Sequence, residues 1–81
     1  MFEVPSLSAS EQSSVAELAR ARQVMAAMQL LHKISGIELR DAKAVEMHIT
    51  RSHGICHWCS GPLEGAGQTE CPKCGSLNFD W

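Results

Sequence analysis

Aromatic residues are scarce in this chain of 81 residues: they make up 5% of it, and tyrosine is absent. No apolar run approaches the ~20 residues that a membrane helix needs, and there is no low-complexity tract. Basic and acidic residues are nearly balanced, seven against nine, for a net charge of -2 with neutral histidines. This charge gives no general attraction to phosphate backbones or anionic membranes, so neither is an expected partner.

A secretory signal is also lacking, because no basic flank followed by an apolar core occurs between Met1 and Ser14. We therefore expect a cytoplasmic protein, in which thiols stay reduced and paired cysteines bind metal more often than they form disulfides. A chain of this length is one domain at most, and its core alone gives slim stability. Such domains usually add a metal, disulfides or a partner subunit.

The N-terminal part is predicted to be a leader followed by a helix. Residues 1–9 are predicted to be a flexible leader, because Pro5 and the serines at positions 6, 8 and 10 interrupt any regular pattern. Two capping boxes, Ser8 to Glu11 and Ser14 to Glu17, are alternative starts for the helix. The composition then predicts one continuous helix from Val15 to Ile34, which Gly36 ends.

A second helix is predicted from Leu39 to Arg51, with Gly54 as its stop. Its apolar residues recur at spacings of three and four. The two helices are predicted to form a helical hairpin over residues 10–53. Because the apolar sector of the first helix is broad, we expect it to present a face to a protein partner or to a second copy of the chain.

Residues 54–81 have a different character, since glycines and prolines replace the long apolar periodicity. The last residues alternate, with Leu77, Phe79 and Trp81 on one face and Asn78 and Asp80 on the other, which predicts a short strand. We expect Phe79 in the core. For Trp81, and for Trp58 further upstream, a core position and an exposed platform for a partner are both open.

Four cysteines in two pairs are the most specific pattern in the chain: Cys56 and Cys59, then eleven residues, then Cys71 and Cys74. Two residues between cysteines let both thiolates of a pair turn toward one ion, and two pairs supply the tetrahedral shell that zinc prefers. We therefore predict one structural zinc ion on Cys56, Cys59, Cys71 and Cys74. Four protein ligands leave no position for a reactive water, so the site is not expected to be catalytic.

With these cysteines, residues 56–81 resemble a zinc ribbon, and the run from Cys71 to Ser76 is similar to its second knuckle. The resemblance implies a C-terminal zinc ribbon (residues 54–81) with short antiparallel strands. With the helical hairpin before it, we expect a small α+β fold. Cys71-Pro72-Lys73-Cys74-Gly75 also resembles a rubredoxin knuckle, which would imply iron. A dithiol redox site and two disulfides are further alternatives with less support.

The histidines near the first cysteine pair have two interpretations, as metal ligands or as surface residues. His48, His53 and His57 lie close to the first pair in sequence, so a second metal site or replacement of a cysteine ligand is conceivable. No carboxylate-histidine set at a useful spacing accompanies them, and we therefore interpret them as surface or supporting residues. His32 is interpreted as a packing residue of the first helix.

A second resemblance covers Ile34 to Glu46, which is similar to the helix-turn-helix in the C-terminal domain of the ribosomal stalk protein. Gly36, Leu39 and Lys43 are among the matching positions. In that family the helix pair docks the GTPase domains of translation factors through basic and apolar side chains. For this chain the resemblance implies a helical hairpin and a protein-docking surface.

Three functions are compatible with these patterns. The leading hypothesis is a non-enzymatic zinc-binding adaptor or regulatory module that contacts other proteins, for which the chain's four methionines suit an adaptable surface. A nucleic-acid-binding ribbon is the alternative, although Lys73 is the only basic residue in 54–81. A rubredoxin-like iron electron carrier is the third. No catalytic triad order, phosphate loop or paired carboxylates point to an enzyme.

Overall fold

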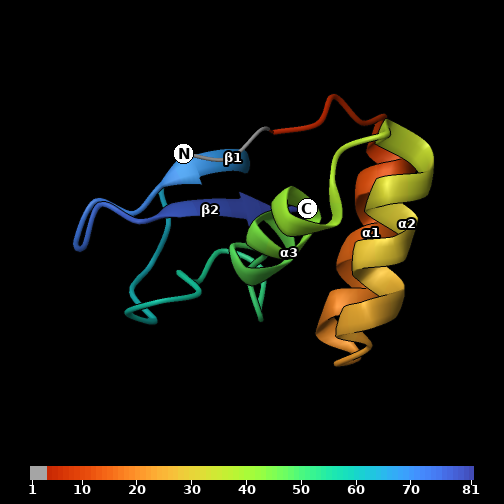
Figure 1. Ribbon diagram of the computed structural model, residues 1–81. Coiled ribbons are helices and arrows are strands. Elements are labelled where there is room, and N and C mark those ends of the chain that lie inside the picture. Colours follow the sequence, from red (N-terminus) through yellow and green to blue (C-terminus); the bar gives the residue numbers. More distant parts are fainter. Residues whose placement is uncertain (1–3) are drawn as a thin grey trace.

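The computed structural model describes residues 4–81, and residues 1–3 of the predicted leader lie outside this range. Figure 1 shows two helices side by side, a third helix beside them, and a small sheet on the far side of that helix. The elements are, in chain order, α1 (Ala9–Arg20), α2 (Val24–Ser35), α3 (Leu39–Met47), β1 (Gly67–Glu70) and β2 (Leu77–Asp80). The predicted small α+β class, with helices first and antiparallel strands last, is confirmed.

The single helix predicted from Val15 to Ile34 is wrong, because the chain reverses direction at residues 21–23. Arg22 adopts the left-handed conformation, with φ of 63°. Its amide donates to the Ala19 carbonyl, and the amide of Gln23 donates to the Leu18 carbonyl. This pair of bonds is the Schellman arrangement that closes helices, here with arginine in the position that usually holds glycine. The reversal lets α1 and α2 pack against each other as antiparallel neighbours (Figure 1).

The start of α1 follows the first of the two predicted capping boxes. The Ser8 hydroxyl accepts a hydrogen bond from the Glu11 amide at 3.1 Å, and the Glu11 carboxylate accepts one from the Ser8 amide at 2.8 Å. Residues 4–7 have no regular secondary structure, yet Pro5 is buried and Val4 and Leu7 pack against the core. The described part of the predicted leader therefore contributes to packing.

Helix α3 begins where the sequence predicts, after Gly36 takes a left-handed φ of 75° and caps α2. It ends at Met47, whereas the sequence predicted Arg51. The reason is that the chain after Met47 pairs with β2: the amide of Phe79 donates to the His48 carbonyl, and the amide of Thr50 donates to the Phe79 carbonyl. A residue engaged in this extended pairing cannot continue the helix.

Strand β2 therefore has a neighbour on each side. On one side β1 runs antiparallel to it, with Gly67 opposite Asp80 and Glu70 opposite Leu77. On the other side Ile49 forms a parallel bridge with Phe79. Backbone hydrogen bonds thus join the helical part of the chain to the cysteine-containing part.

The core is shared by the helices and by the C-terminal strand. Phe79 is fully buried, and its ring centroid lies 4.9 Å from that of Trp81, which is only 8% exposed. Both rings belong to one cluster with residues from all three helices: Val15, Ala16, Ala19, Ala27, Met28, Leu31, Ala42 and Val45. The apolar surface of the helices is thus largely buried within the chain. Within residues 4–81, no helix has the length and apolarity to cross a membrane.

Arg20 connects α1 to the C-terminal part through a set of side-chain hydrogen bonds. Its guanidinium donates to the Thr50 carbonyl at 2.9 Å, to the Thr50 hydroxyl at 2.7 Å and to the Trp81 carbonyl at 2.7 Å. The Thr50 hydroxyl in turn donates to Asp80 at 2.8 Å, and Arg20 lies 3.8 Å from the same carboxylate. Asp80 also accepts from the Gly54 amide, so the network holds the chain just before the cysteines.

Replacing Arg20 by alanine is expected to lower the free energy of unfolding by about 2 to 4 kcal/mol, because it leaves the carbonyls of Thr50 and Trp81 without this donor and removes the cation beside Asp80. Arg40→Ala is the matched control, since Arg40 also pairs with a carboxylate, that of Glu38, but both side chains are well exposed. Its effect is expected to stay within about 0.5 kcal/mol. Urea unfolding followed by circular dichroism compares the two variants, and equal losses would contradict the role assigned to Arg20.

Candidate metal centre

The two cysteine pairs lie in turns with matching backbone hydrogen bonds. In the first turn the Cys56 amide donates to the Gly61 carbonyl, and the Ser60 amide donates to the Cys56 carbonyl. The second turn, which connects β1 to β2, repeats both bonds: the Cys71 amide donates to the Ser76 carbonyl, and the Gly75 amide donates to the Cys71 carbonyl. Each turn therefore directs its two sulfurs to the same side.

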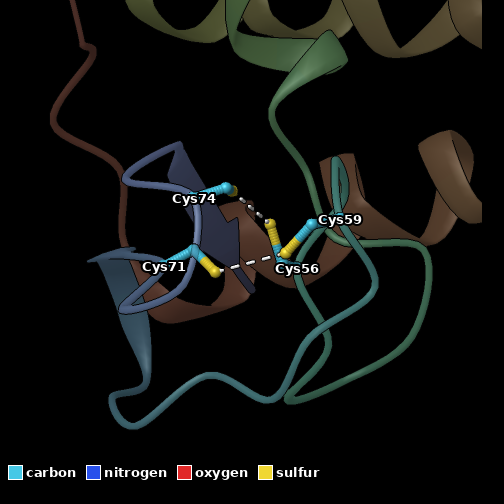
Figure 2. A group of neighbouring side chains, drawn as sticks. All are labelled: Cys56, Cys59, Cys71 and Cys74. Carbon is cyan, nitrogen blue, oxygen red and sulfur yellow. Dashed lines mark hydrogen bonds between the residues drawn. The ribbon is translucent and has the colours of Figure 1, made fainter.

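The four sulfurs converge, as Figure 2 shows, and lie within 4.8 Å of one another. Cys56 Sγ is 3.7 Å from Cys74 Sγ, and Cys59 Sγ is 3.5 Å from Cys71 Sγ. A tetrahedral ion with metal–sulfur bonds of about 2.3 Å requires sulfur separations of about 3.8 Å, so these distances fit. They are too long for disulfides, whose sulfurs are about 2.05 Å apart, and all four thiols are free. The predicted ligands Cys56, Cys59, Cys71 and Cys74 are thus positioned to bind one metal ion.

The first cysteine of each pair faces the interior and the second faces solvent. Cys56 and Cys71 are 2% and 3% exposed, whereas Cys59 and Cys74 are exposed. An ion held by these sulfurs would have protein on one side and would lie near the surface on the other. Because the protein supplies four ligands, such an ion has the closed shell of a structural site.

Asn78 supports this site, although the sequence singled it out only as lying on the face of the terminal strand opposite Phe79. Its side chain is fully buried, and its amide nitrogen donates to Cys56 Sγ at 3.4 Å and to the Ser76 carbonyl at 3.0 Å. Its amide oxygen accepts from the His57 amide at 2.8 Å. One side chain thus connects β2 to both cysteine turns and donates to a metal-binding sulfur. Such supporting partners orient the ligands and tune the metal.

These bonds also determine which nitrogen of His57 carries a proton. The Asn78 oxygen must be the atom that faces the His57 amide, because a backbone amide can only donate. His57 Nδ1 lies 2.6 Å from the same oxygen and must therefore donate as well. The same reasoning applies to His48, whose Nδ1 lies 2.7 Å from the Ala44 carbonyl oxygen. Both rings are oriented by fixed acceptors and supply no ligand to the four-sulfur site.

The surroundings of Cys56 favour its thiolate. Burial works to raise the pKa of this thiol, but hydrogen bonds from the backbone at Cys59 and Trp58 and from the Asn78 side chain outweigh it and lower the pKa to about 6, from an ordinary value of 9.0. A Cys56 thiolate is the species that binds a metal cation. The amide of Trp58 is one of the donors, at 3.4 Å from the sulfur.

The other thiols are shifted in different directions. The hydroxyl and the amide of Ser76 lower the pKa of Cys74. The Gly61 backbone works to lower the pKa of Cys59 too, but the neighbouring sulfurs, Cys71 above all, outweigh it and raise the pKa to about 11. Four negative charges therefore do not coexist easily at this site without a cation. Metal binding is expected to displace the remaining protons, as it does at thiolate sites in general.

Ser60 and Gly75 occupy equivalent positions in the two turns, each one residue after the second cysteine, with φ of 63° and 77°. Glycine adopts this left-handed conformation without strain, whereas serine does not. We expect Ser60→Gly to raise the free energy of unfolding by up to about 1 kcal/mol. The measurement is a urea titration at a fixed excess of metal. Ser52→Gly is the control, because Ser52 is exposed but has no positive φ, and a similar gain there would contradict the explanation.

The remaining residues singled out in the sequence lie outside the four-sulfur cluster. His53 is well exposed and approaches Asp80 at 3.4 Å, and His32 contacts the Ile37 carbonyl at the turn after α2. For the two tryptophans the sequence left a core position and an exposed position open, and the structure gives each a different one. Trp81 belongs to the core, whereas Trp58, in the first turn, is 76% exposed. Only four-cysteine ligation has geometric support among the described residues.

Comparison with protein-family models, with curated proteins and with solved structures finds no match to this chain. The resemblances to a zinc ribbon and to the stalk-protein hairpin therefore rest on the motifs of the sequence alone. The geometry supports a coarser conclusion: the chain is a small α+β fold whose four cysteines are positioned to bind a metal ion.

Proposed function

We propose that this chain is a non-enzymatic protein-interaction module, of the adaptor or regulatory kind, whose fold is stabilised by one structural zinc ion. The observation that carries the proposal is the closed set of four cysteine sulfurs, spaced as a tetrahedral ion requires. Zinc is the ion because it prefers such a thiolate shell in reduced compartments, and the free thiols fit a cytoplasmic location.

The part of the proposal that concerns protein interaction rests on surface residues. In the described part of the chain, the large apolar side chains that remain exposed are Val24, Met25, Leu39, Met47, Ile55 and Trp58. The broad apolar face expected for the single predicted helix is mostly buried, because that segment forms two helices, α1 and α2, that pack against each other. A protein partner or a second copy of the chain would therefore meet this smaller set, most of it at element ends and beside the first cysteine turn.

Metal analysis together with sedimentation tests the proposal. We expect one zinc per chain, no visible absorption band, and either self-association at micromolar concentration or metal-dependent binding of a protein. A red protein containing iron would instead identify an electron carrier. Tight, salt-dependent retention of an oligonucleotide would identify a nucleic-acid binder, since each phosphate contact adds to the salt dependence.

A further inference from the structure

A hollow of about 510 Å³ opens between the end of α3 and the first cysteine turn. This volume lies within the usual range of sites that accept one compact ligand group. The end of α3, the chain after it and the two cysteine turns together line it, mainly with Met47, His48, Arg51, His57, Trp58 and Ser76. The helical part of the chain and the metal centre thus contribute to the same surface.

Two exposed apolar side chains meet at this hollow. Trp58 is 76% exposed and Met47 is 59% exposed, so each leaves most of its apolar surface in water. Tryptophan and methionine are enriched in protein-protein interfaces, where tryptophan often contributes most of the binding energy. The other strongly exposed methionine of a helix, Met25 on α2, does not line the hollow.

The wall that carries Trp58 is held by the metal centre itself. The Trp58 amide donates to Cys56 Sγ, and the preceding residue, His57, is fixed to Asn78 by its amide and by its ring. With the metal bound, these bonds hold the backbone at Trp58 in one conformation before a ligand arrives. A preorganised surface binds more tightly because less ordering accompanies association.

The wall of the hollow contains one basic and one acidic side chain, and the basic one, Arg51, is exposed. Lys43 does not line the hollow, but it is exposed one helical turn before Met47 on the same face of α3. The only carboxylate in the wall, that of Glu46, is 8% exposed and thus largely withdrawn from solvent. Since the whole chain has a net charge of -2, this basic edge is a local feature.

We propose that this hollow docks a peptide segment of a partner protein in which a large apolar residue adjoins one or two carboxylates. The apolar side chain packs between Trp58 and Met47, and a carboxylate pairs with Arg51. A nucleic acid fits less well, because it needs several phosphate contacts and the wall offers one arginine. The inference rests on the proposed function, for which it supplies the docking site and the chemistry of the partner.

The test is selection from a display library of random twelve-residue peptides against the zinc-loaded full chain, followed by titration of the enriched peptides. We expect enrichment of peptides that combine Leu, Phe or Trp with neighbouring Asp or Glu. Trp58→Ala and Arg51→Glu are each expected to weaken their binding at least about 10-fold. Met47→Ala and Met25→Ala form the matched pair, because these methionines are 59% and 60% exposed. Only Met47→Ala is expected to weaken binding.

The possible outcomes separate this inference from the proposed function. Peptides that bind equally well to Trp58→Ala but lose affinity for Met25→Ala would overturn the inference and leave the interaction module intact. Enrichment of basic peptides would also overturn it, as would tighter binding of a ten-nucleotide thymidine strand than of any peptide. Absence of peptide binding, of self-association and of bound zinc would overturn both. Cobalt substitution, read from its visible spectrum, verifies that each variant still forms the four-sulfur site.

Discussion

Removal of the metal ion is expected to unfold residues 54–81 and to loosen the packing of the helices. This part of the chain contains two strands of four residues each, and its main contributions to the core are Phe79 and Trp81. Structural zinc at thiolate sites contributes about 10–16 kcal/mol of apparent binding free energy at neutral pH, which matches or exceeds the whole stability of a typical domain, about 5–15 kcal/mol. Without the ion, electrostatic repulsion between thiolates also opposes the closed arrangement.

The measurement uses the buried Trp81 as a reporter. In a Trp58→Phe variant, Trp81 is the only tryptophan, and its fluorescence is expected to shift to the red when a chelator removes the metal. Adding zinc back should restore the emission, whereas magnesium should not, because magnesium prefers oxygen ligands. A Trp81 spectrum that stays unchanged after complete loss of metal would show that the core holds the C-terminal part by itself.

The metal-binding arrangement of the cysteines could be predicted from the sequence because each pair is a local pattern in which two thiolates can turn toward one ion. The same holds for the capping box at Ser8 and for the glycine cap at Gly36, since each depends on residues within one turn of the chain. The sequence correctly predicted the end of α2 and the start of α3, and it offered the start of α1 at Ser8 as one of two alternatives. Residues close in sequence determine these helix ends, and no contact with a distant part of the chain opposes them.

The reversal at Arg22 could not be predicted in the same way. Alanine, arginine and glutamine all favour helix, so the local preference at residues 21–23 opposes a break. The break is stabilised by contacts between residues far apart in sequence: α1 packs on α2, and Arg20 reaches Thr50 and Trp81. Tertiary packing therefore overrides propensity here. Because this turn was not predicted, the sequence suggested one helix with an apolar face broad enough to remain available to a partner.

The roles of Asn78 and Asp80 in β2 were missed for a related reason. Alternation in the terminal strand put these two residues on the face opposite Phe79 and said nothing about what covers that face. The core position expected for Phe79 is confirmed, whereas for Trp81, which is also buried, the sequence had left a core and an exposed position open. In the structure a cysteine turn covers Asn78, and the chain from Thr50 to Gly54 surrounds Asp80. A polar residue in a short strand has no sequence signal that separates exposure from burial in a hydrogen-bonded network.

Asn78→Asp is expected to damage the metal site more than any other single change outside the cysteines. The substitution replaces the amide nitrogen, which donates to Cys56 Sγ and to the Ser76 carbonyl, by an oxygen that can only accept when ionised. A buried carboxylate would then face a thiolate and a carbonyl. One carboxylate oxygen would still accept from His57, but the oxygen facing Cys56 would be buried without a donor. Such an uncompensated buried charge costs about 3–5 kcal/mol, and losing a supporting hydrogen bond lowers metal affinity by about 10- to 100-fold.

Gln68→Glu is the matched control, because it makes the same amide-to-carboxylate change on the adjacent strand, at an exposed residue opposite Phe79. It adds the same charge without touching the sulfurs, and its effect on metal affinity is expected to be less than about 3-fold. Competition with a chromophoric chelator measures both affinities, and urea unfolding of the metal-loaded proteins measures both stabilities. Equal losses in the two variants would mean that net charge, and not the Asn78 hydrogen bonds, determines the affinity. If the difference appears as expected, Asn78 is what connects the terminal strand to the metal, and the four cysteines alone do not account for the strength of the site.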